Sequence, residues 1–494
     1  MSGSGSETGG PHHRVVIVGA GFGGIALALR LRRAGVEDLV VLEKEDDLGG
    51  TWLVNTYPGC QCDVESVLYS LSDAPNPDWS RTFAPQPEIE EYLRSVADRF
   101  DLKRQIRFGT ELLGADWHED GQRWSLETSA GPLTADVLVL AAGFLTEPAL
   151  PAIEGLDRFE GTLFHSARWD HGHDLTGERV AVIGTGASAI QFVPAIQPRV
   201  GHLTVFQRTP PWVVPRPDRP FRPWEQWLFA HVRLATRLSR ARVYWSRELL
   251  ALMFTRYPGL SRVAARAALA HLEAQVPDEE LRARLTPDYA LGCKRVLLSN
   301  DYLPALGRPT TELVTDPIAR ILPHAVVTAD GTERPVDTII LGTGFEATEP
   351  PIARRVRAAD GRTIRQHWGG SMRAYLGTTL PDFPNLFMII GPNTGLGHSS
   401  MIFMIESQAN YVVDALKTMT ARNLASVVVD PAAVDRFDEE VQQKMGHTVW
   451  ASGCSSWYLD ASGRNTTLWP DFTWRYRQRT RRFDADRYRV TRAS

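Results

Sequence analysis

Two glycine-rich loops restrict the fold of this chain more than any other feature of its sequence. The first, Gly19 to Gly24, follows an apolar run and precedes a helix pattern, and the second runs from Gly184 to Ala189. In this context a G-x-G-x-x-G or G-x-G-x-x-A loop brings backbone and a helix N-terminus up to a pyrophosphate. One nucleotide fold holds one such loop. We therefore predict an α/β protein with two Rossmann-like dinucleotide-binding domains.

A second repeated pattern supports this prediction. The stretch 136–144, DVLVLAAGF, is a buried-strand pattern that ends in small residues, and the stretch 337–345, DTIILGTGF, nearly copies it. Small residues at the end of a strand let the chain turn beside a bound nucleotide. Because a glycine loop and a closing strand occur together twice, we infer a repeat of whole domains.

The residue after the second strand of each unit predicts which nucleotide binds there. Glu43 follows the strand pattern 39–42, and a carboxylate at this point accepts hydrogen bonds from ribose hydroxyls and repels a 2′-phosphate. Arg208 and Thr209 follow the strand pattern 203–207, where a guanidinium can bind the 2′-phosphate of NADP through two nitrogens. We predict FAD in the first domain and NADP in the second. The alternative for Arg208 is an unrelated surface arginine.

The segment 159–170 lies between the two units and must set the angle between them. Read as F-x-G-x-x-x-H-x-x-x-W-D, it resembles the fingerprint of the Baeyer–Villiger monooxygenases, a branch of the class B flavoprotein monooxygenases. The alternative is an ordinary linker with scattered aromatic residues. The resemblance implies an enzyme that uses FAD, NADPH and dioxygen. Such an enzyme inserts one oxygen atom beside a ketone carbonyl through a flavin peroxide and releases an ester or lactone.

The same resemblance implies three catalytic residues. Arg295, in the run Gly292-Cys293-Lys294-Arg295, is expected at the flavin edge as a permanent cation, with Asp63 to orient it. Lys294 is included as its neighbour. The alternative for the Lys294-Arg295 pair is an exposed basic patch. His165, in the linker, is expected to act through structure rather than as a base, since no step requires one.

Further residues are expected to contact the cofactors. Gly50, Trp52 and Tyr57 belong to segments that resemble the family's flavin-contacting region, although Trp52 could equally pack in a core. Trp457 belongs to a stretch that resembles the family's mobile loop over NADP. The full set expected to contact FAD or NADP is Gly19, Gly21, Gly24, Glu43, Gly50, Thr51, Trp52, Tyr57, Asp63, Gly184, Gly186, Ser188, Ala189, Gln191, Arg208, Thr209, Asn393 and Trp457.

These patterns predict a domain organisation. We expect a disordered tail over 1–12, an FAD domain from 13–150 and 380–494, and a linker over 151–178. The NADP domain should comprise 179–214 and 286–379, interrupted by a helical insertion over 215–285. The insertion mixes Trp, Leu and Arg, which is compatible with contact at a membrane surface. We favour its packing over the substrate cleft and expect no membrane contact.

Composition excludes several classes of function. The formal net charge of −4 gives no electrostatic reason to expect nucleic acid or an anionic membrane as a partner. Four cysteines are too few for a disulfide framework, and Cys60 and Cys62 lack the spacing of a metal finger, so a reducing cytoplasm fits. The expected partners are a small ketone and dioxygen. The sequence carries no signal of oligomeric state.

Four other functions remain open at this stage. A related class B enzyme could oxygenate a nitrogen or sulfur atom with the same fold. A disulfide reductase also pairs FAD with a nicotinamide, but Cys60 and Cys62 are too close for its redox pair. A nonoxygenating NADPH-flavin reductase is a further, less favoured alternative. A nucleotide-binding module that has lost catalysis is disfavoured by the complete loops.

Overall fold

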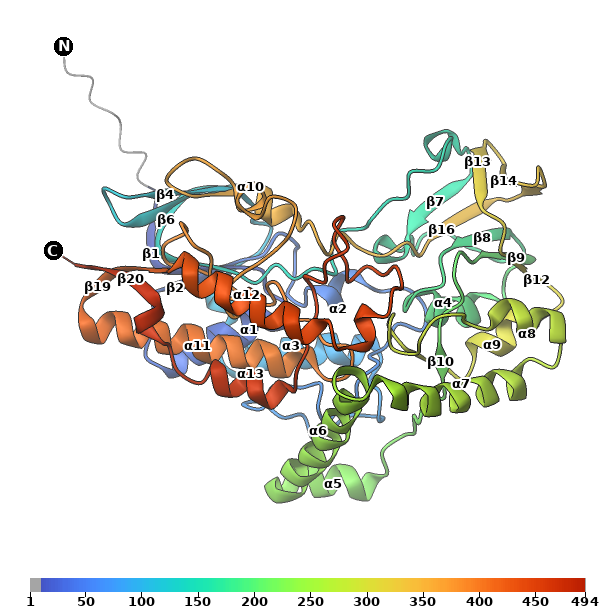
Figure 1. Ribbon diagram of the computed structural model, residues 1–494, viewed down its shortest axis with the longest axis horizontal. Coiled ribbons are helices and arrows are strands. Elements are labelled where there is room, and N and C mark those ends of the chain that lie inside the picture. Colours follow the sequence, from blue (N-terminus) through green and yellow to red (C-terminus); the bar gives the residue numbers. More distant parts are fainter. Residues whose placement is uncertain (1–9, 494) are drawn as a thin grey trace, which may run out of the picture.

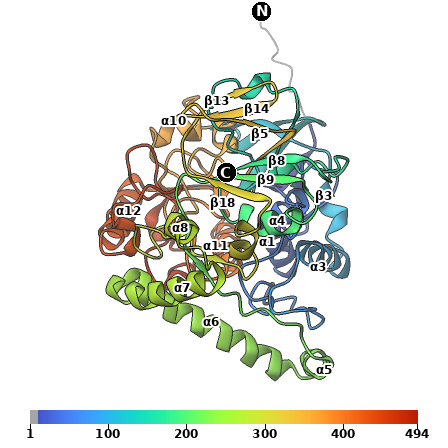
Figure 2. The same ribbon diagram turned by 90° about the vertical axis from the view of Figure 1, so that its right-hand side faces the viewer.

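The computed structural model describes residues 10–493 and confirms a mixed α/β fold with two parallel-type sheets (Figure 1). Most of the expected tail lies outside the described residues, and the first strand begins at His12. The first sheet lies on one side of the molecule and the second on the other, with the helical insertion along a third edge (Figures 1 and 2).

The first sheet has the strand order β17-β4-β5-β6-β1-β2-β3, and β18 also pairs with β6. The pairs β1–β2, β1–β6 and β6–β18 are parallel, whereas β4, β5 and β6 form an antiparallel meander. Its strands are β1 (His12–Val18), β2 (Leu39–Leu42), β3 (Ile106–Arg107), β4 (Leu112–His118), β5 (Arg123–Thr128), β6 (Gly131–Leu140), β17 (Val356–Arg357) and β18 (Leu386–Met388).

The second sheet is parallel throughout, in the order β12-β9-β8-β16-β7. Its strands are β7 (Thr162–His165), β8 (Arg179–Ile183), β9 (His202–Phe206), β12 (Thr311–Val314) and β16 (Thr338–Leu341). The smaller sheets are formed by β10 (Val213–Val214) with β11 (Leu297–Leu298), by β13 (Ile318–Leu322), β14 (Ala325–Thr328) and β15 (Glu333–Pro335), and by β19 (Leu424–Val429) with β20 (Tyr488–Arg492).

Helices cover the sheets and form the expected insertion. They are α1 (Phe22–Arg33), α2 (Thr51–Val54), α3 (Gln86–Arg99), α4 (Ala189–Ile196), α5 (Pro223–His231), α6 (Arg233–Thr255), α7 (Ser261–Gln275), α8 (Glu279–Leu285), α9 (Tyr302–Leu306), α10 (Ile364–Trp368), α11 (Met401–Arg422), α12 (Pro431–Met445) and α13 (Thr473–Arg479). The insertion consists of α5 to α8. Within residues 10–493 no helix combines the length and apolar character needed to cross a bilayer.

Two strands lie in a different unit from the one their sequence position suggested. β7, inside the expected linker, pairs with β16 and forms an edge of the second sheet. β17, inside the range expected for the second domain, pairs with β4 of the first sheet. Both strands are short, and backbone pairing rather than a side-chain pattern determines where they lie. The linker motif is therefore fixed to the second unit by a strand.

Candidate functional site

The first glycine loop is built for close backbone approach. A Cβ atom at Gly24 would lie 1.9 Å from the carbonyl oxygen of Gly19, and Gly19 itself has a φ of +103°. Gly21 is the N-cap of α1, and Gly50 approaches it so closely that a Cβ at Gly50 would lie 3.0 Å from the Gly21 Cα. Side chains at Gly19, Gly24 and Gly50 would collide with backbone, so glycine lets the loop turn tightly at the N-terminus of α1, where a pyrophosphate would bind.

A cavity of about 430 Å³ opens beside this loop. Six residues of the predicted cofactor set line it: Gly19, Gly21, Glu43, Gly50, Thr51 and Trp52. Gly24, Tyr57 and Asp63 are not among its lining residues. Gly24 instead acts through the packing of α1 against the loop. A glycine cradle, a helix N-terminus and a carboxylate at the second strand are the groups that FAD requires, so these residues fit that cofactor.

The carboxylate of Glu43 is held at the wall of this cavity. It is buried and accepts hydrogen bonds from the backbone N–H groups of Ala20, at 2.7 Å, and Glu45, at 3.1 Å. Burial raises its pKa, and these hydrogen bonds act in the opposite direction. The side chain therefore presents a fixed acceptor beside the glycine loop, as the sequence predicted for ribose binding.

The second glycine loop has the same construction. Gly184 has a φ of +111°, and a Cβ there would lie 2.4 Å from the Gly342 oxygen, which belongs to the second closing-strand pattern. A Cβ at Gly186 would project into open space, so packing within the protein does not require glycine at that position. Ser188 is the N-cap of α4 and Ala189 its first residue. Close approach of a ligand is the remaining physical reason for Gly186.

Two predicted cofactor residues bond to each other and join the units. The Tyr57 hydroxyl donates to Gln191 Oε1 at 3.1 Å, and Gln191 Nε2 donates to the backbone oxygen of Gln61 at 3.0 Å. A Cβ at Gly59 would lie 2.7 Å from the backbone oxygen of Gln191, so α4 packs directly on the segment that contains Tyr57 and Gly59. Tyr57 and Gln191 thereby connect the first unit to the helix that follows the second glycine loop.

A pair of cations lies beside the second glycine loop. Lys294 Nζ lies 4.8 Å from the centre of the Tyr289 ring. Partial burial lowers the pKa of Lys294, and the nearby charge of Arg208 lowers it further. Arg208 is exposed. Two like charges at one place suit a doubly charged anion such as a phosphate.

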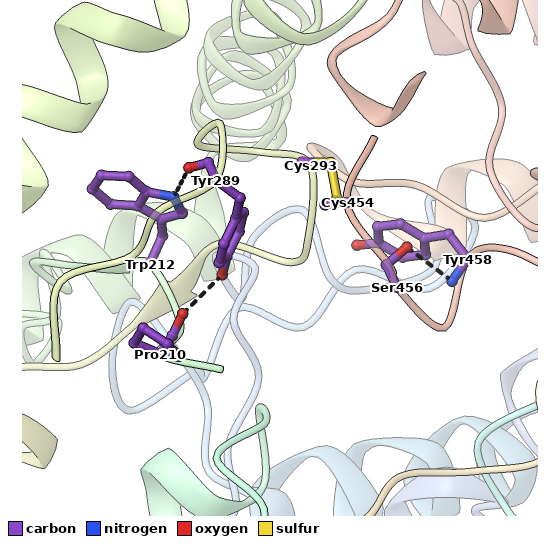
Figure 3. Close-up of a disulfide and its surroundings, with 7 residues drawn as sticks. All are labelled: Pro210, Trp212, Tyr289, Cys293, Cys454, Ser456 and Tyr458. Carbon is purple, nitrogen blue, oxygen red and sulfur yellow. Dashed lines mark hydrogen bonds between the residues drawn. A yellow bond between two sulfur atoms is a disulfide. The ribbon is translucent and has the colours of Figure 1, made fainter. Parts of the chain in front are cut away.

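The Tyr289 ring fixes one member of this pair. Its hydroxyl donates to the Pro210 oxygen at 3.1 Å, and the Trp212 indole donates to the Tyr289 backbone oxygen at 2.9 Å (Figure 3). Pro210 follows Arg208-Thr209 directly in the chain, and the Thr209 oxygen accepts a hydrogen bond from Thr185 Oγ1 at 3.3 Å. The segment that carries Arg208 is therefore tied both to Lys294 and to the glycine loop.

Arg295 and Asp63 form an ion pair between distant parts of the chain. Asp63 Oδ2 accepts from Arg295 Nη2 at 2.5 Å and from Nε at 3.1 Å, and Arg295 Nη1 donates to the Leu396 oxygen at 2.9 Å. Each side chain is 28% exposed. Asp63 raises the pKa of the Arg295 guanidinium. Burial would raise the pKa of Asp63, but the charge and hydrogen bonds of Arg295, together with the charge of Arg247 and a backbone hydrogen bond, outweigh burial and lower the pKa. Both groups therefore stay charged.

A disulfide joins the Arg295 segment to the C-terminal loop. Cys293 is bonded to Cys454, 161 positions later in the sequence, with Cα atoms 6.2 Å apart (Figure 3). The sequence did not predict this bridge, because pairing of four cysteines cannot be read from their spacing. The bridge also runs against the reducing compartment that the cysteine count suggested. Cys60 and Cys62 are free, and burial raises the pKa of Cys60 to about 12.

The bridged loop carries Trp457 and Tyr458. Trp457 is 44% exposed and packs against Phe144, which lines the first cavity. Tyr458 is buried. Burial raises its pKa to about 12, although the charge of Arg295 acts in the opposite direction. Tyr458 therefore stays neutral beside Arg295. From the sequence we named only Trp457, although Tyr458 is the next residue in the same stretch.

Two other predicted residues, Asn393 and His165, make hydrogen bonds within the protein. The Asn393 amide donates to the backbone oxygens of Asn465 and Leu468, each at 3.0 Å, so it anchors the C-terminal segment. The His165 ring is buried and accepts the Ala167 N–H through Nδ1 at 3.1 Å. Burial lowers the pKa of His165 to about 4, which keeps the imidazole neutral.

The two units, each with a glycine loop before a helix, define an oxidoreductase with two dinucleotide sites. The family model for pyridine nucleotide-disulphide oxidoreductases matches residues 16–240. The chain is 51% identical over 484 residues to a Baeyer-Villiger monooxygenase from Streptomyces coelicolor, covering 97% of this chain and 93% of that one. This chain belongs to the Baeyer–Villiger monooxygenase family.

Two solved structures agree with this assignment. OTEMO in complex with FAD and NADP aligns with a TM-score of 0.88 at 27% identity, covering 97% of this chain and all of that one. Cyclohexanone monooxygenase from Rhodococcus sp. Phi1 bound to NADP+ aligns with a TM-score of 0.87 at 30% identity, covering 98% of this chain and all of that one. The fold predicted from the glycine loops is confirmed.

Proposed function

We propose that Arg295, held by Asp63, supplies the fixed positive charge for insertion of an oxygen atom beside a ketone carbonyl. The chain is an FAD- and NADPH-dependent monooxygenase of the Baeyer–Villiger type. When bound, the two cofactors supply hydride transfer and the activation of dioxygen. The protein supplies binding, orientation and electrostatics.

The Arg295–Asp63 pair is the observation that carries this proposal. Attack on a carbonyl places negative charge on oxygen, and a cation already fixed in place stabilises that charge without reorganisation. Arg295 donates two hydrogen bonds to Asp63 and one to the Leu396 oxygen, and these fix the guanidinium plane. Neither residue exchanges a proton, because the pKa of Asp63 is lowered and that of Arg295 raised.

Arg208 and Lys294 support a phosphate site for NADPH. Glu43 at the first site would repel a 2′-phosphate, whereas the paired cations at the second attract one. Lys294 stands over Tyr289 and close to Arg208. We therefore propose that Lys294 recognises NADPH with Arg208, in place of the catalytic role that the sequence suggested, and that Arg295 alone serves the reaction.

Product analysis tests this function. We expect linear, cyclic or aryl ketones to stimulate NADPH and dioxygen consumption, with products that gain one oxygen atom as esters or lactones. Products confined to N-oxides or sulfoxides would contradict carbonyl attack and support the related class B reaction. NADPH oxidation that gives only hydrogen peroxide with every ketone would instead identify a reductase.

We also propose a cytoplasmic location for the enzyme, which rests on its composition and against which the Cys293–Cys454 bridge is a contrary observation. Fractionation of the native host should place it with cytoplasmic markers. Recovery with secreted proteins would overturn this assignment.

A further inference from the structure

We propose that the outward face of α6, together with α5, docks on an anionic lipid surface. Four residues form what we call the α6 stripe: Leu234, Leu238, Trp245 and Leu249. They are 63%, 61%, 56% and 66% exposed, respectively. They recur four or seven residues apart, which places them on one side of the helix. The stripe is an apolar face without a partner in the described chain.

Exposed apolar side chains are concentrated in this part of the molecule. Twelve of the eighteen large apolar side chains that are exposed within residues 10–493 lie between positions 224 and 269. They include Trp224 and Trp227 of α5, at 58% and 59% exposure. α5 and α6 form an outer edge of the molecule, away from both sheets (Figures 1 and 2). A gathering of this kind marks an interaction site, whereas isolated exposed residues do not.

The opposite side of α6 is anchored, so the stripe cannot turn inward. Arg240 donates to the backbone oxygens of Val67 and Ser70, at 3.1 and 2.8 Å. Two turns further along the helix, Arg247 forms an ion pair with Glu65 at 2.6 Å. Near its end, the helix buries Glu248, which accepts two hydrogen bonds from Thr473. These polar contacts fix the rotation of α6 about its axis.

The charges of this face select the kind of partner. Four arginines of α6 and its C-cap are exposed, Arg233, Arg237, Arg242 and Arg256. The only acidic residues between positions 224 and 269 are Glu225 and Glu248.

Neither acid offsets the arginines at the surface. Glu225 is bound through both oxygens by Arg219, and Glu248 is buried. Apolar side chains flanked by arginines are the pattern of helices that lie in the interface of an anionic bilayer. A symmetric contact with a second copy would instead oppose arginines with arginines.

The net charge of the chain does not reveal the local excess of arginines around the α6 stripe. A formal charge of −4 averages over the whole surface and gave no reason to expect an anionic membrane. From the sequence we favoured packing of the insertion over the substrate cleft. In the structure, one side of the insertion packs against the rest of the chain and the stripe stays exposed. Phe254 of α6 packs so closely on Gly292 that a Cβ there would lie 2.4 Å from its ring, while the stripe faces outward.

Vesicle sedimentation with the full-length FAD-loaded enzyme tests the proposal. We expect binding to vesicles of equimolar phosphatidylcholine and phosphatidylglycerol, little binding to phosphatidylcholine alone, and release by high salt. Arg237→Gln combined with Arg242→Gln should weaken binding about 30-fold, as expected for two arginines near an anionic surface. Trp245→Ala combined with Leu249→Ala should weaken it by a similar factor.

Matched variants away from this face provide the controls. Leu150, 69% exposed, and Arg320, also exposed, lie outside the insertion, so Leu150→Ala and Arg320→Gln should bind vesicles as the parent does. All variants should retain NADPH oxidation. Absence of binding to anionic vesicles would overturn the proposal, as would binding that the stripe variants leave unchanged. A dimer that dissociates in Trp245→Ala, without vesicle binding, would assign the face to a second copy and overturn it too.

Discussion

Arg295 donates two hydrogen bonds, of 2.5 Å from Nη2 and 3.1 Å from Nε, to Oδ2 of Asp63, which lies 232 positions away in the sequence. The pair joins the segment after the insertion to the segment after the first glycine loop. Its geometry gives Arg295 one orientation, because Nη1 is held separately by the Leu396 oxygen. Removal of the arginine would leave a carboxylate without its principal partner, so the two residues act as a unit.

The paired cations at the second site predict a selective effect on cofactor choice. Arg208→Ala should weaken NADPH binding by about 1–3 kcal/mol, the range for a hydrogen bond to a charged group, and leave NADH binding nearly unchanged. Titration of the two nucleotides by fluorescence measures both values. Arg320→Ala, an exposed arginine of β13, serves as the control. Unaltered preference for NADPH in the Arg208 variant would remove it from the phosphate site.

The buried linker histidine predicts a pH dependence of stability but not of catalysis. The pKa of His165 is about 4 in the folded protein, below its ordinary value near 6.5, because burial disfavours the cation. Between these values the unfolded chain binds the extra proton, so the free energy of unfolding should fall as pH decreases from about 6.5 to 4, by at most about 3 kcal/mol.

Substitution of the histidine tests both parts of this prediction. In His165→Gln this dependence should be reduced, as measured by denaturation at several pH values, and activity should fall without a change in the shape of its pH profile. Loss of an acidic or alkaline limb from the activity profile would show that His165 titrates during the reaction.

The bridge between Cys293 and Cys454 predicts a difference in thiol accessibility. In the unfolded but unreduced enzyme, an alkylating reagent should modify Cys60 and Cys62 only, and all four cysteines after reduction. Intact mass spectrometry distinguishes the two results. Cys454→Ser should lower the free energy of unfolding by about 2–4 kcal/mol, since the bridge closes a long loop. Alkylation of four cysteines without prior reduction would contradict the bridge.

Local patterns in the sequence predicted the parts of the fold that repeat. The two glycine loops lie between strands and helices as expected, because Gly24 and Gly184 occupy positions where a side chain would collide with backbone. Glu43 likewise lies at the end of its strand and beside the loop. These features depend on residues close in the chain, which is why spacing alone could predict them.

Contacts between segments distant in the chain were harder to predict from the sequence. The Asp63–Arg295 pair was expected through family resemblance rather than from spacing, and the Cys293–Cys454 bridge was not expected at all. The nearness of Lys294, which contacts the Tyr289 ring, to Arg208 was not expected either. Such relationships depend on how two units pack, and no periodicity in either unit encodes them.

The ratio of ester to hydrogen peroxide formed by the reduced Arg295→Ala variant tests the central claim most directly. The variant should bind FAD and accept hydride from NADPH, but lose ester formation on the order of 10²–10³-fold, as after removal of an oxyanion-stabilising group. Arg295→Lys should retain part of the activity because it keeps the charge. We predict that NADPH consumption in Arg295→Ala yields hydrogen peroxide in place of ester. Ester formation at the parental rate, without additional hydrogen peroxide, would contradict the role assigned to Arg295.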